Sequence, residues 1–191
     1  MVYTVGTHGV NKMIYISAGH HHEKQGASYN GFTEHEEAKI WVSLIDNLLG
    51  YGSMVVPVGI LKNKVAFINE RAKQNDLAVE IHFNSALDNN GDPIGEGSET
   101  LYYPTSARGK AIAECVQDSL GELMHPNRGA KEGYYQMDKT KGADFFLART
   151  VCTAIIIEPE FIHMEDNIIN NREEACNVIA NSLIEALLDN P

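Results

Sequence analysis

Short apolar runs alternate along the chain with longer stretches in which apolar residues recur every three or four positions. A short apolar run bounded by turn residues is typical of a buried strand, whereas the three- and four-residue recurrence is typical of an amphipathic helix. The runs predict strands over residues 13–17, 53–58, 77–83, 99–103 and 154–158. The longer stretches predict helices over residues 34–49, 62–75, 106–124, 142–149 and 172–188. This alternation favours an α/β domain of three layers, with a largely parallel (mixed) central sheet flanked by helices.

Three local patterns refine this outline. Thr33 followed three residues later by Glu36 has the spacing of a capping box, so the first helix should begin near Glu34, with Glu36 in the capping role. Along residues 77–83, the alternation of apolar and polar side chains places Glu80 and His82 on the same face of a strand. Residues 129–140 show no clear period, and we expect irregular structure there, with one short strand over residues 134–137.

The length and charge of the chain narrow the classes of protein to consider. Its 191 residues fit a single domain, which we expect over residues 13–191, preceded by an N-terminal extension over residues 1–12. The formal net charge of −11 disfavours nucleic-acid binding, because an acidic surface repels phosphate backbones. No run of 18 apolar residues predicts a membrane-spanning helix, and the first residues lack the basic and apolar segments of a secretory signal.

Chemically reactive side chains lie at the end of three predicted strands or shortly after it. In sequence order these residues are His20, His82, Asn84, Glu158 and Glu160. The carboxyl ends of parallel strands meet at one edge of a sheet, where α/β proteins bind ligands. Glu34, at the start of the first helix, adds another carboxylate. Two imidazoles and one carboxylate form a favoured zinc-binding set that leaves a fourth position for water, and zinc bound there would lower the pKa of that water so that a carboxylate outside the set could take its proton.

The order of these motifs resembles that of the zinc-dependent N-acetylmuramoyl-L-alanine amidases, which are peptidoglycan hydrolases of bacteria and of phage lysis systems. The motifs are a Gly-His pair, a glutamate that opens a helix, Ile-His-x-Asn after a strand and a strand-end glutamate. The matching segments are ISAGH (16–20), TEHEEAKIWVSLIDNLL (33–49), NERAKQNDLAVEIHFNS (69–85), SETLYY (98–103) and IIIEPEFI (155–162). The resemblance implies that His20, Glu34 and His82 bind one zinc ion per chain. It also implies that Glu158 is the general base and acid, and that residues 13–191 form one catalytic amidase domain.

Each of these assignments has a rival or a departure from the family pattern nearby. The rivals are His21 and His22 for His20, Glu36 and Glu37 for Glu34, and Glu160 for Glu158. Glu80 stands where the family usually has serine, and it would either orient the His82 imidazole or compete for the metal. Asn84 and Glu160 are candidates for supporting the site or contacting the substrate, and Glu160-Phe161 stands where the family commonly has Gly-Phe.

The resemblance implies hydrolysis of the amide between N-acetylmuramic acid and the L-alanine of the peptidoglycan stem peptide. Two alternatives stay open: a zinc carboxypeptidase-like peptidase and a catalytically silent cell-wall-binding protein. The peptidase would need an arginine that grips a terminal carboxylate, and the candidates are Arg71, Arg108, Arg128 and Arg149. Because no signal peptide is predicted, we expect a protein that waits in the cytoplasm for release, as a phage endolysin does, or that acts outside the cell after lysis. The sequence predicts no particular oligomeric state.

Overall fold

The computed structural model describes residues 12–135 and 139–189, which form a mixed six-stranded sheet with helices on both faces. The strands of the sheet are β1 (Ile14–Ala18), β4 (Ser53–Val55), β5 (Leu77–Ile81), β6 (Ser98–Tyr102), β7 (Asn127–Glu132) and β8 (Thr153–Glu158). The α-helices are α1 (Glu34–Leu49), α2 (Leu61–Asn69), α3 (Ala107–Leu123), α4 (Phe145–Arg149) and α5 (Glu165–Asp189). Two short strands, β2 (Ser28–Tyr29) and β3 (Phe32–Thr33), pair in a hairpin, and η1 (Gly50–Gly52) and η3 (Lys139–Lys141) are single 3₁₀ turns.

The strand order is β4-β1-β5-β8-β6-β7. The first four strands of this order run parallel to one another, whereas β6 runs antiparallel to β8 and parallel to β7. The predicted three-layer fold with a largely parallel, mixed sheet is therefore confirmed. The reversal at β6 matters for the site, because it places the first residues of β6 beside the last residues of β8.

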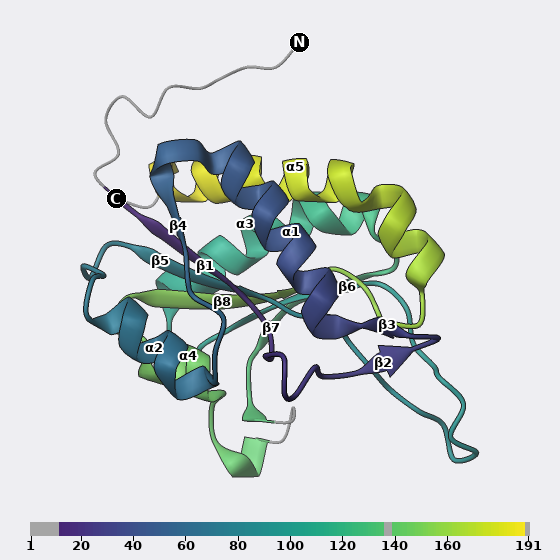
Figure 1. The fold of residues 1–191 in the computed structure, drawn as a ribbon. Helices are drawn as coiled ribbons and strands as arrows, with labels where there is room; N and C mark the ends of the chain where they lie inside the picture. Colours follow the sequence, from purple (N-terminus) through teal and green to yellow (C-terminus); the bar gives the residue numbers. More distant parts are fainter. Residues whose placement is uncertain (1–11, 136–138, 190–191) are drawn as a thin grey trace.

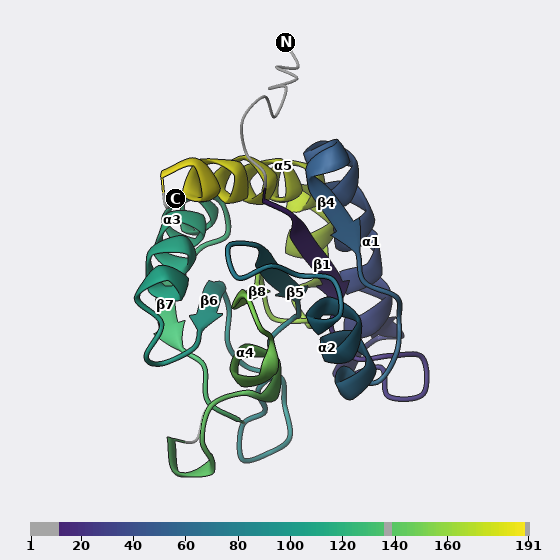
Figure 2. The ribbon, with the colours of Figure 1, turned by 90° about the vertical axis from the view of Figure 1, so that its left-hand side faces the viewer.

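Both faces of the sheet are covered, as Figure 1 and the turned view in Figure 2 show. Helices α1, α3 and α5 pack on one face, in a cluster that includes Ile16, Val79 and Ile155. Helices α2 and α4 pack on the other face, against strand residues such as Ala78 and Ile156. Successive strand residues point to opposite faces, so a strand covered on both sides reads as a continuous apolar run.

The start of α1 lies where the sequence predicted it, but the predicted capping box is wrong. Thr33 is the N-cap residue, yet its side chain makes no capping hydrogen bond, and its Oγ1 is buried without a partner among the residues that the structure describes. The backbone N–H groups of Glu34 and His35 instead donate to the carbonyls of Ala27 and Gln25 (2.9 and 3.0 Å). The preceding loop therefore satisfies donors that a side-chain cap would otherwise satisfy.

Three other helices differ in length from their predictions. Helix α4 begins at Phe145 rather than at residue 142, because Asp144 is its N-cap residue and accepts a hydrogen bond from the Phe146 backbone (2.8 Å). Helix α2 ends at Asn69 rather than near residue 75, because the Asp76 carboxylate accepts hydrogen bonds from the Lys73 and Met13 backbones (2.7 and 2.9 Å) and holds the chain in a turn. Helix α5 begins at Glu165, seven residues before the predicted start. Its first turns are rich in asparagine, a weak helix former, so local propensity hid them.

The segment expected to be irregular contains strand β7, so that prediction is wrong for residues 129–132. The sequence of β7 (NRGAKE) has no apolar alternation, because the strand lies at the edge of the sheet and is largely exposed or half-buried. Of the short strand predicted over residues 134–137, Tyr134 forms an isolated bridge with Ala143, and residues 136–138 lie outside the described residues. The predicted N-terminal extension, residues 1–12, also lies outside them except for Lys12. Within the described ranges, no helix is both long and apolar enough to cross a membrane.

Candidate metal site and catalytic edge

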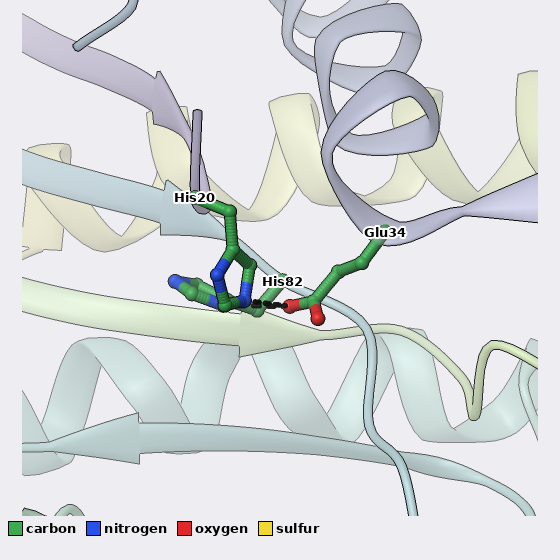
Figure 3. Close-up of side chains that lie close together, drawn as sticks. All are labelled: His20, Glu34 and His82. Carbon is green, nitrogen blue, oxygen red and sulfur yellow. Dashed lines mark hydrogen bonds and ion pairs between the residues drawn. The ribbon is translucent and has the colours of Figure 1, made fainter. Parts of the chain in front are cut away.

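His20, Glu34 and His82 come together at the carboxyl edge of the sheet (Figure 3). Glu34 Oε1 lies 2.9 Å from His20 Nε2 and 2.8 Å from His82 Nδ1. One ligand atom from each residue lies within 4.8 Å of the other two. Three residues far apart in the sequence thus present two imidazole nitrogens and a carboxylate to one point.

The backbone around His20 brings its imidazole to this point. His20 follows β1 in a left-handed conformation (φ 58°), which is uncommon for a residue with a side chain. The Gly19 N–H before it donates to the Ile81 carbonyl (2.7 Å), and the Gly19 carbonyl accepts a hydrogen bond from the buried His35 ring (2.7 Å). Burial lowers the pKa of His35, which suits a neutral ring that donates one N–H. The turn after β1 is therefore held from β5 and from α1.

Two glycines leave room for the cluster. A Cβ atom on Gly26 would lie 2.4 Å from Glu34 Oε2 and 2.5 Å from His20 Cδ2. A Cβ atom on Gly19 would lie 2.7 Å from the His82 ring. These distances are too short for real contacts, so any side chain at either position would displace a member of the cluster.

His82 has a second carboxylate partner. Its Nε2 lies 3.1 Å from Glu80 Oε2, and Glu80 Oε1 accepts a hydrogen bond from Lys64 Nζ on α2 (2.8 Å). Lys64 also donates to the Ala18 carbonyl at the end of β1. Lys64 and Glu80 are both buried, with 3% and 2% of their surface exposed. A buried chain of contacts thus runs from α2 through β5 to the imidazole.

The charges in this cluster depend on one another. Burial alone would raise the pKa of Glu34, but hydrogen bonds from His20 and His82 outweigh it and hold that pKa well below its usual range. Burial likewise opposes the charged form of Glu80, but His82 and Lys64 lower its pKa to about 2. The two carboxylates overcome the burial of His82 and raise its pKa well above the usual value. A cation is therefore favoured between these carboxylates.

Glu158 lies on the strand next to His82. The His82 N–H donates to the Ile157 carbonyl (3.0 Å), so His82, directly after β5, lies beside Glu158 at the end of β8. Unlike Glu34 and Glu80, the Glu158 carboxylate receives no hydrogen bond from the residues that the structure describes, and the groups that act on it are nearby charges. Burial, together with the charges of Glu34 and Glu99, raises the pKa of Glu158 to about 7. A carboxyl with such a pKa can both take up and release a proton near neutral pH.

Glu160 and Asn84 have structural partners. Glu160 is fully buried, and its carboxylate accepts hydrogen bonds from the backbone N–H groups of Gly97 and Phe161 (2.6 and 2.9 Å) and from Asn167 Nδ2 (2.6 Å). Asn84 is half-buried and donates to Glu99 Oε1 (2.8 Å). Since a side chain without exposed surface is out of reach of a substrate, we propose a supporting role for Glu160 rather than substrate contact.

The protein family to which this arrangement belongs follows from a family model. The model of the N-acetylmuramoyl-L-alanine amidase family matches residues 14–189, which include the whole cluster and Glu158. The chain belongs to this family.

Solved structures of amidases share the fold. The catalytic domain of an endolysin targeting Clostridia Difficile is 24% identical, with a TM-score of 0.68, covering 91% of this chain and 97% of that domain. The AmiC2 amidase of Nostoc punctiforme is 23% identical (TM-score 0.68; 95% and 98% covered). The CwlD amidase from Clostridioides difficile, solved with the GerS lipoprotein, is 19% identical (TM-score 0.73; 94% and 99% covered). A search of curated proteins found no match.

The residues that the sequence offered as alternatives to His20 and Glu34 are not part of the cluster. His22 is exposed beside Glu23, and His21 pairs with Lys24 through the backbone. Glu36 is exposed and bonded to Lys39 (2.8 Å). Glu37 is buried, but it faces the other way, where it accepts hydrogen bonds from Arg172 and Trp41.

Sequence reasoning missed three side chains around the site: His35, Lys64 and Glu99. Two of them left a signal in the sequence. Lys64 lies one turn before Ile68 on the buried face of α2. Glu99 lies two residues before Leu101 and therefore on the same face of β6. A charged residue on a face that is otherwise apolar is informative, because it needs a partner when it is buried. His35 left no such signal, because its partner, the Gly19 carbonyl, comes from a distant segment.

Proposed function

We propose that the chain is a zinc-dependent hydrolase that cleaves the amide between N-acetylmuramic acid and the L-alanine of the peptidoglycan stem peptide. The observation that carries the proposal is the convergence of His20, Glu34 and His82 beside Glu158, at one edge of a sheet. Membership of the amidase family supports the same reaction.

The donor set fits zinc. Two histidines and one glutamate are a common ligand set of catalytic zinc sites, and a carboxylate on the far nitrogen of a ligand histidine is its usual support. His20 Nε2, His82 Nδ1 and Glu34 Oε1 would hold the ion, and Glu80 would orient His82. Bound there, zinc would supply Lewis acidity to the amide carbonyl and lower the pKa of a water molecule.

The protein's own part in the reaction is proton transfer by Glu158. Its ionised carboxylate would take a proton from the attacking water and return it to the alanine nitrogen as the amide bond breaks. A pKa near 7 suits both steps, because the group then gives up and takes up a proton at similar cost. Proton transfer of this kind typically contributes about 10²–10⁴-fold to the rate.

One observation favours a second candidate, the carboxypeptidase-like reaction. It needs an arginine near the reacting centre, and Arg128 binds Glu99, whose β6 position is opposite Glu158. The other candidates lie elsewhere: Arg108, for example, donates to the carbonyls of residues 74–76, at the opposite end of β5.

Mass spectrometry of purified peptidoglycan after digestion distinguishes the two reactions. The amidase reaction releases intact stem peptides that begin with L-alanine and leaves N-acetylmuramic acid with a free carboxyl group. The carboxypeptidase reaction releases a single C-terminal amino acid and leaves the peptide joined to the sugar. A digest with neither product would favour a cell-wall-binding protein and contradict the proposal.

Removal of metal is expected to abolish hydrolysis without unfolding the chain. The apolar clusters on both faces of the sheet are built without the site, and a chain of this size buries enough surface to fold without a metal. After treatment with a strong chelator, circular dichroism should keep its helical signal while activity disappears, and added zinc should restore activity. Loss of cooperative unfolding in the chelated protein would show a structural metal instead. The setting of the reaction, endolysin-like cell-wall lysis, stays a prediction.

A further inference from the structure

A row of ionisable side chains runs from strand to strand along the edge of the sheet and continues beyond His82 and Glu158. His82 is next to Glu158, and Glu158 pairs with Glu99 in the register of β8 and β6. Glu99 Oε2 accepts a hydrogen bond from Arg128 Nε (2.9 Å), and Arg128 belongs to β7, the following strand. Glu158 and Glu99 each lie two residues from a side chain that packs towards α2 and α4, namely Ile156 and Leu101, so both carboxylates are on that face.

Arg128 is held in a defined orientation. Its anchor, Glu99, is 2% exposed, and the other oxygen of Glu99 accepts a hydrogen bond from Asn84 (2.8 Å). The Arg128 guanidinium carbon lies 4.9 Å from the centre of the Phe161 ring. A guanidinium stacked on a ring and bonded through Nε presents its two terminal nitrogens away from the anchor.

Those terminal nitrogens are available to a ligand. Within residues 12–135 and 139–189, Arg128 Nη1 and Nη2 make no hydrogen bond, and 33% of the side chain is exposed. Lys131 Nζ also binds Glu99 Oε2, so two cations share one carboxylate, whose pKa these contacts lower against the effect of burial. The formal charge of this trio is +1 (two positive, one negative), in a chain whose net charge is −11. The trio is therefore suited to an anion.

Three of the other four arginines use their terminal nitrogens in hydrogen bonds within the protein. Arg108 donates from both to backbone carbonyls, Arg71 donates from Nη1 to the Phe67 carbonyl, and Arg172 donates from Nη2 to Glu37. Arg149 is exposed and lies over the Phe145 ring. It is the last residue of α4, which leads to the start of β8, whereas Glu158 lies at the end of β8. Arg128 thus combines a buried anchor, open donors and a place beside Glu158.

We propose that Arg128 binds a carboxylate of the stem peptide, on the residue that follows the L-alanine. The inference rests on the proposed amidase reaction. On the sugar side of the cleaved amide, the lactyl carboxyl group of N-acetylmuramic acid is consumed in that amide, so a carboxylate near Arg128 must come from the peptide. Terminal guanidinium nitrogens bind a carboxylate through two parallel hydrogen bonds.

The spacing of the strands fits this residue. Neighbouring strands lie about 4.8 Å apart, so two steps from β8 to β7 span roughly 10 Å. An extended peptide advances at most about 3.5 Å per residue, so the second residue lies about 7 Å from the cleaved bond. The length of the arginine side chain covers the remaining distance.

The test uses two N-acetylmuramoyl tripeptides that carry an amidated C-terminus and differ in one group. In both, the second residue is a glutamate joined to the third residue through its γ-carboxyl group, so its α-carboxyl group is a free carboxylate in one compound and a carboxamide in the other. Both lack a C-terminal carboxylate, so a carboxypeptidase would cleave neither. The values of kcat and KM are measured for the parent protein and for Arg128→Gln, Arg128→Lys and Arg149→Gln, and a melting curve is recorded for each variant.

The parent should prefer the acid substrate, and Arg128→Gln should raise KM for that substrate about tenfold while KM for the amide substrate stays unchanged. The loss of the Arg128 charge near Glu158 should change kcat by the same factor for both substrates. Arg128→Lys should keep part of the preference, and Arg149→Gln, which changes an arginine stacked on a ring elsewhere, should behave as the parent does. An equal rise in KM for both substrates, or a parent that does not distinguish them, would overturn the proposal and leave Arg128 as a structural link between β6 and β7.

A binding measurement separates this inference from the proposed function. If the parent cleaves neither tripeptide, the proposed amidase reaction fails, and calorimetric titration with the same two compounds then decides the role of Arg128. Tighter binding of the acid compound by the parent, lost in Arg128→Gln, would support the carboxylate site. Equal binding of the two compounds would overturn it.

Discussion

Glu158 and Glu160 stand two residues apart at the end of β8, but their surroundings differ. Glu160 is fully buried and receives three hydrogen bonds, two of them from backbone N–H groups. Glu158 is half-buried, lies beside His82 and is surrounded by the charges of Glu34, Glu99 and Arg128. The pKa of Glu158 is raised to about 7, chiefly by burial.

The comparison separates two uses of a carboxylate. A carboxylate whose oxygens are occupied by fixed donors stabilises the segments that carry those donors, and any proton transfer would disrupt these bonds. A carboxylate that is desolvated without such donors exchanges a proton near neutral pH at little cost. Glu160 therefore connects the loop before β6, the end of β8 and the start of α5, while Glu158 is free to react.

The largest expected effect that tests this contrast is on the rate. Glu158→Gln should lower kcat by about 10²–10⁴-fold, because only the proton transfer is lost. The variant should still bind close to one zinc per chain, since Glu158 is not part of the three-residue cluster. Kinetics together with metal analysis checks both statements, and a variant with full activity would contradict the proposed mechanism.

Glu80 extends the contrast to a carboxylate whose partner is itself a candidate ligand. Glu80→Gln should weaken zinc binding by about 10–100-fold, because the His82 ring loses the charged partner that orients it. Glu37→Gln is the matched control, since Glu37 is equally buried and equally paired with a cation, but its hydrogen-bond partners in the described part of the chain, Arg172 and Trp41, lie outside the cluster. Competition with a chromophoric chelator measures the affinity. Equal zinc affinity in the two variants would show that Glu80 only stabilises the fold.

Replacing Glu160 should affect stability rather than chemistry. Glu160→Gln turns an acceptor into an amide that satisfies fewer of the three donors, which should cost about 1–3 kcal/mol in the free energy of unfolding. The kcat of the folded variant should stay within a few-fold of the parent value. Urea unfolding followed by assays well below the midpoint separates the two quantities. A stable but inactive variant would mean that Glu160, and not Glu158, is the base.

The last expected effect is a pH-dependent change in stability, measured in the presence of a chelator. Since the pKa of Glu158 is raised from 4.5 to about 7 by folding, its contribution to stability is fully present below pH 4.5 and is lost as the pH rises through 7. The glutamine introduced by Glu158→Gln does not titrate, so this variant should gain about 2–3 kcal/mol relative to the parent between pH 5 and pH 8. Denaturant unfolding at both pH values measures the difference. A difference that is independent of pH would show that the pKa of Glu158 is not raised.

Local patterns in the sequence were enough for the main elements and for the residues of the candidate site. The period of the apolar residues reports which face of a helix or strand is buried, and this needs no knowledge of what covers it. Buried runs such as β5 and β8 were therefore predicted, and so was the start of α1 at Glu34. The motif order also selected His20, Glu34 and His82 ahead of their neighbours, and the structure brings these three together.

The edge strand β7 and the early turns of α5 were not predictable in this way, because neither has an apolar period of its own. The partner of each ionisable group could not be predicted from the sequence either. Lys64 meets Glu80 across 16 residues, Arg128 meets Glu99 across 29, and His82 meets Glu34 across 48. These contacts depend on the strand order and on the reversal at β6, and only long-range packing sets both. A side chain's chemistry depends on the charges and donors around it, so the different surroundings of Glu158 and Glu160 emerge only once the chain has folded.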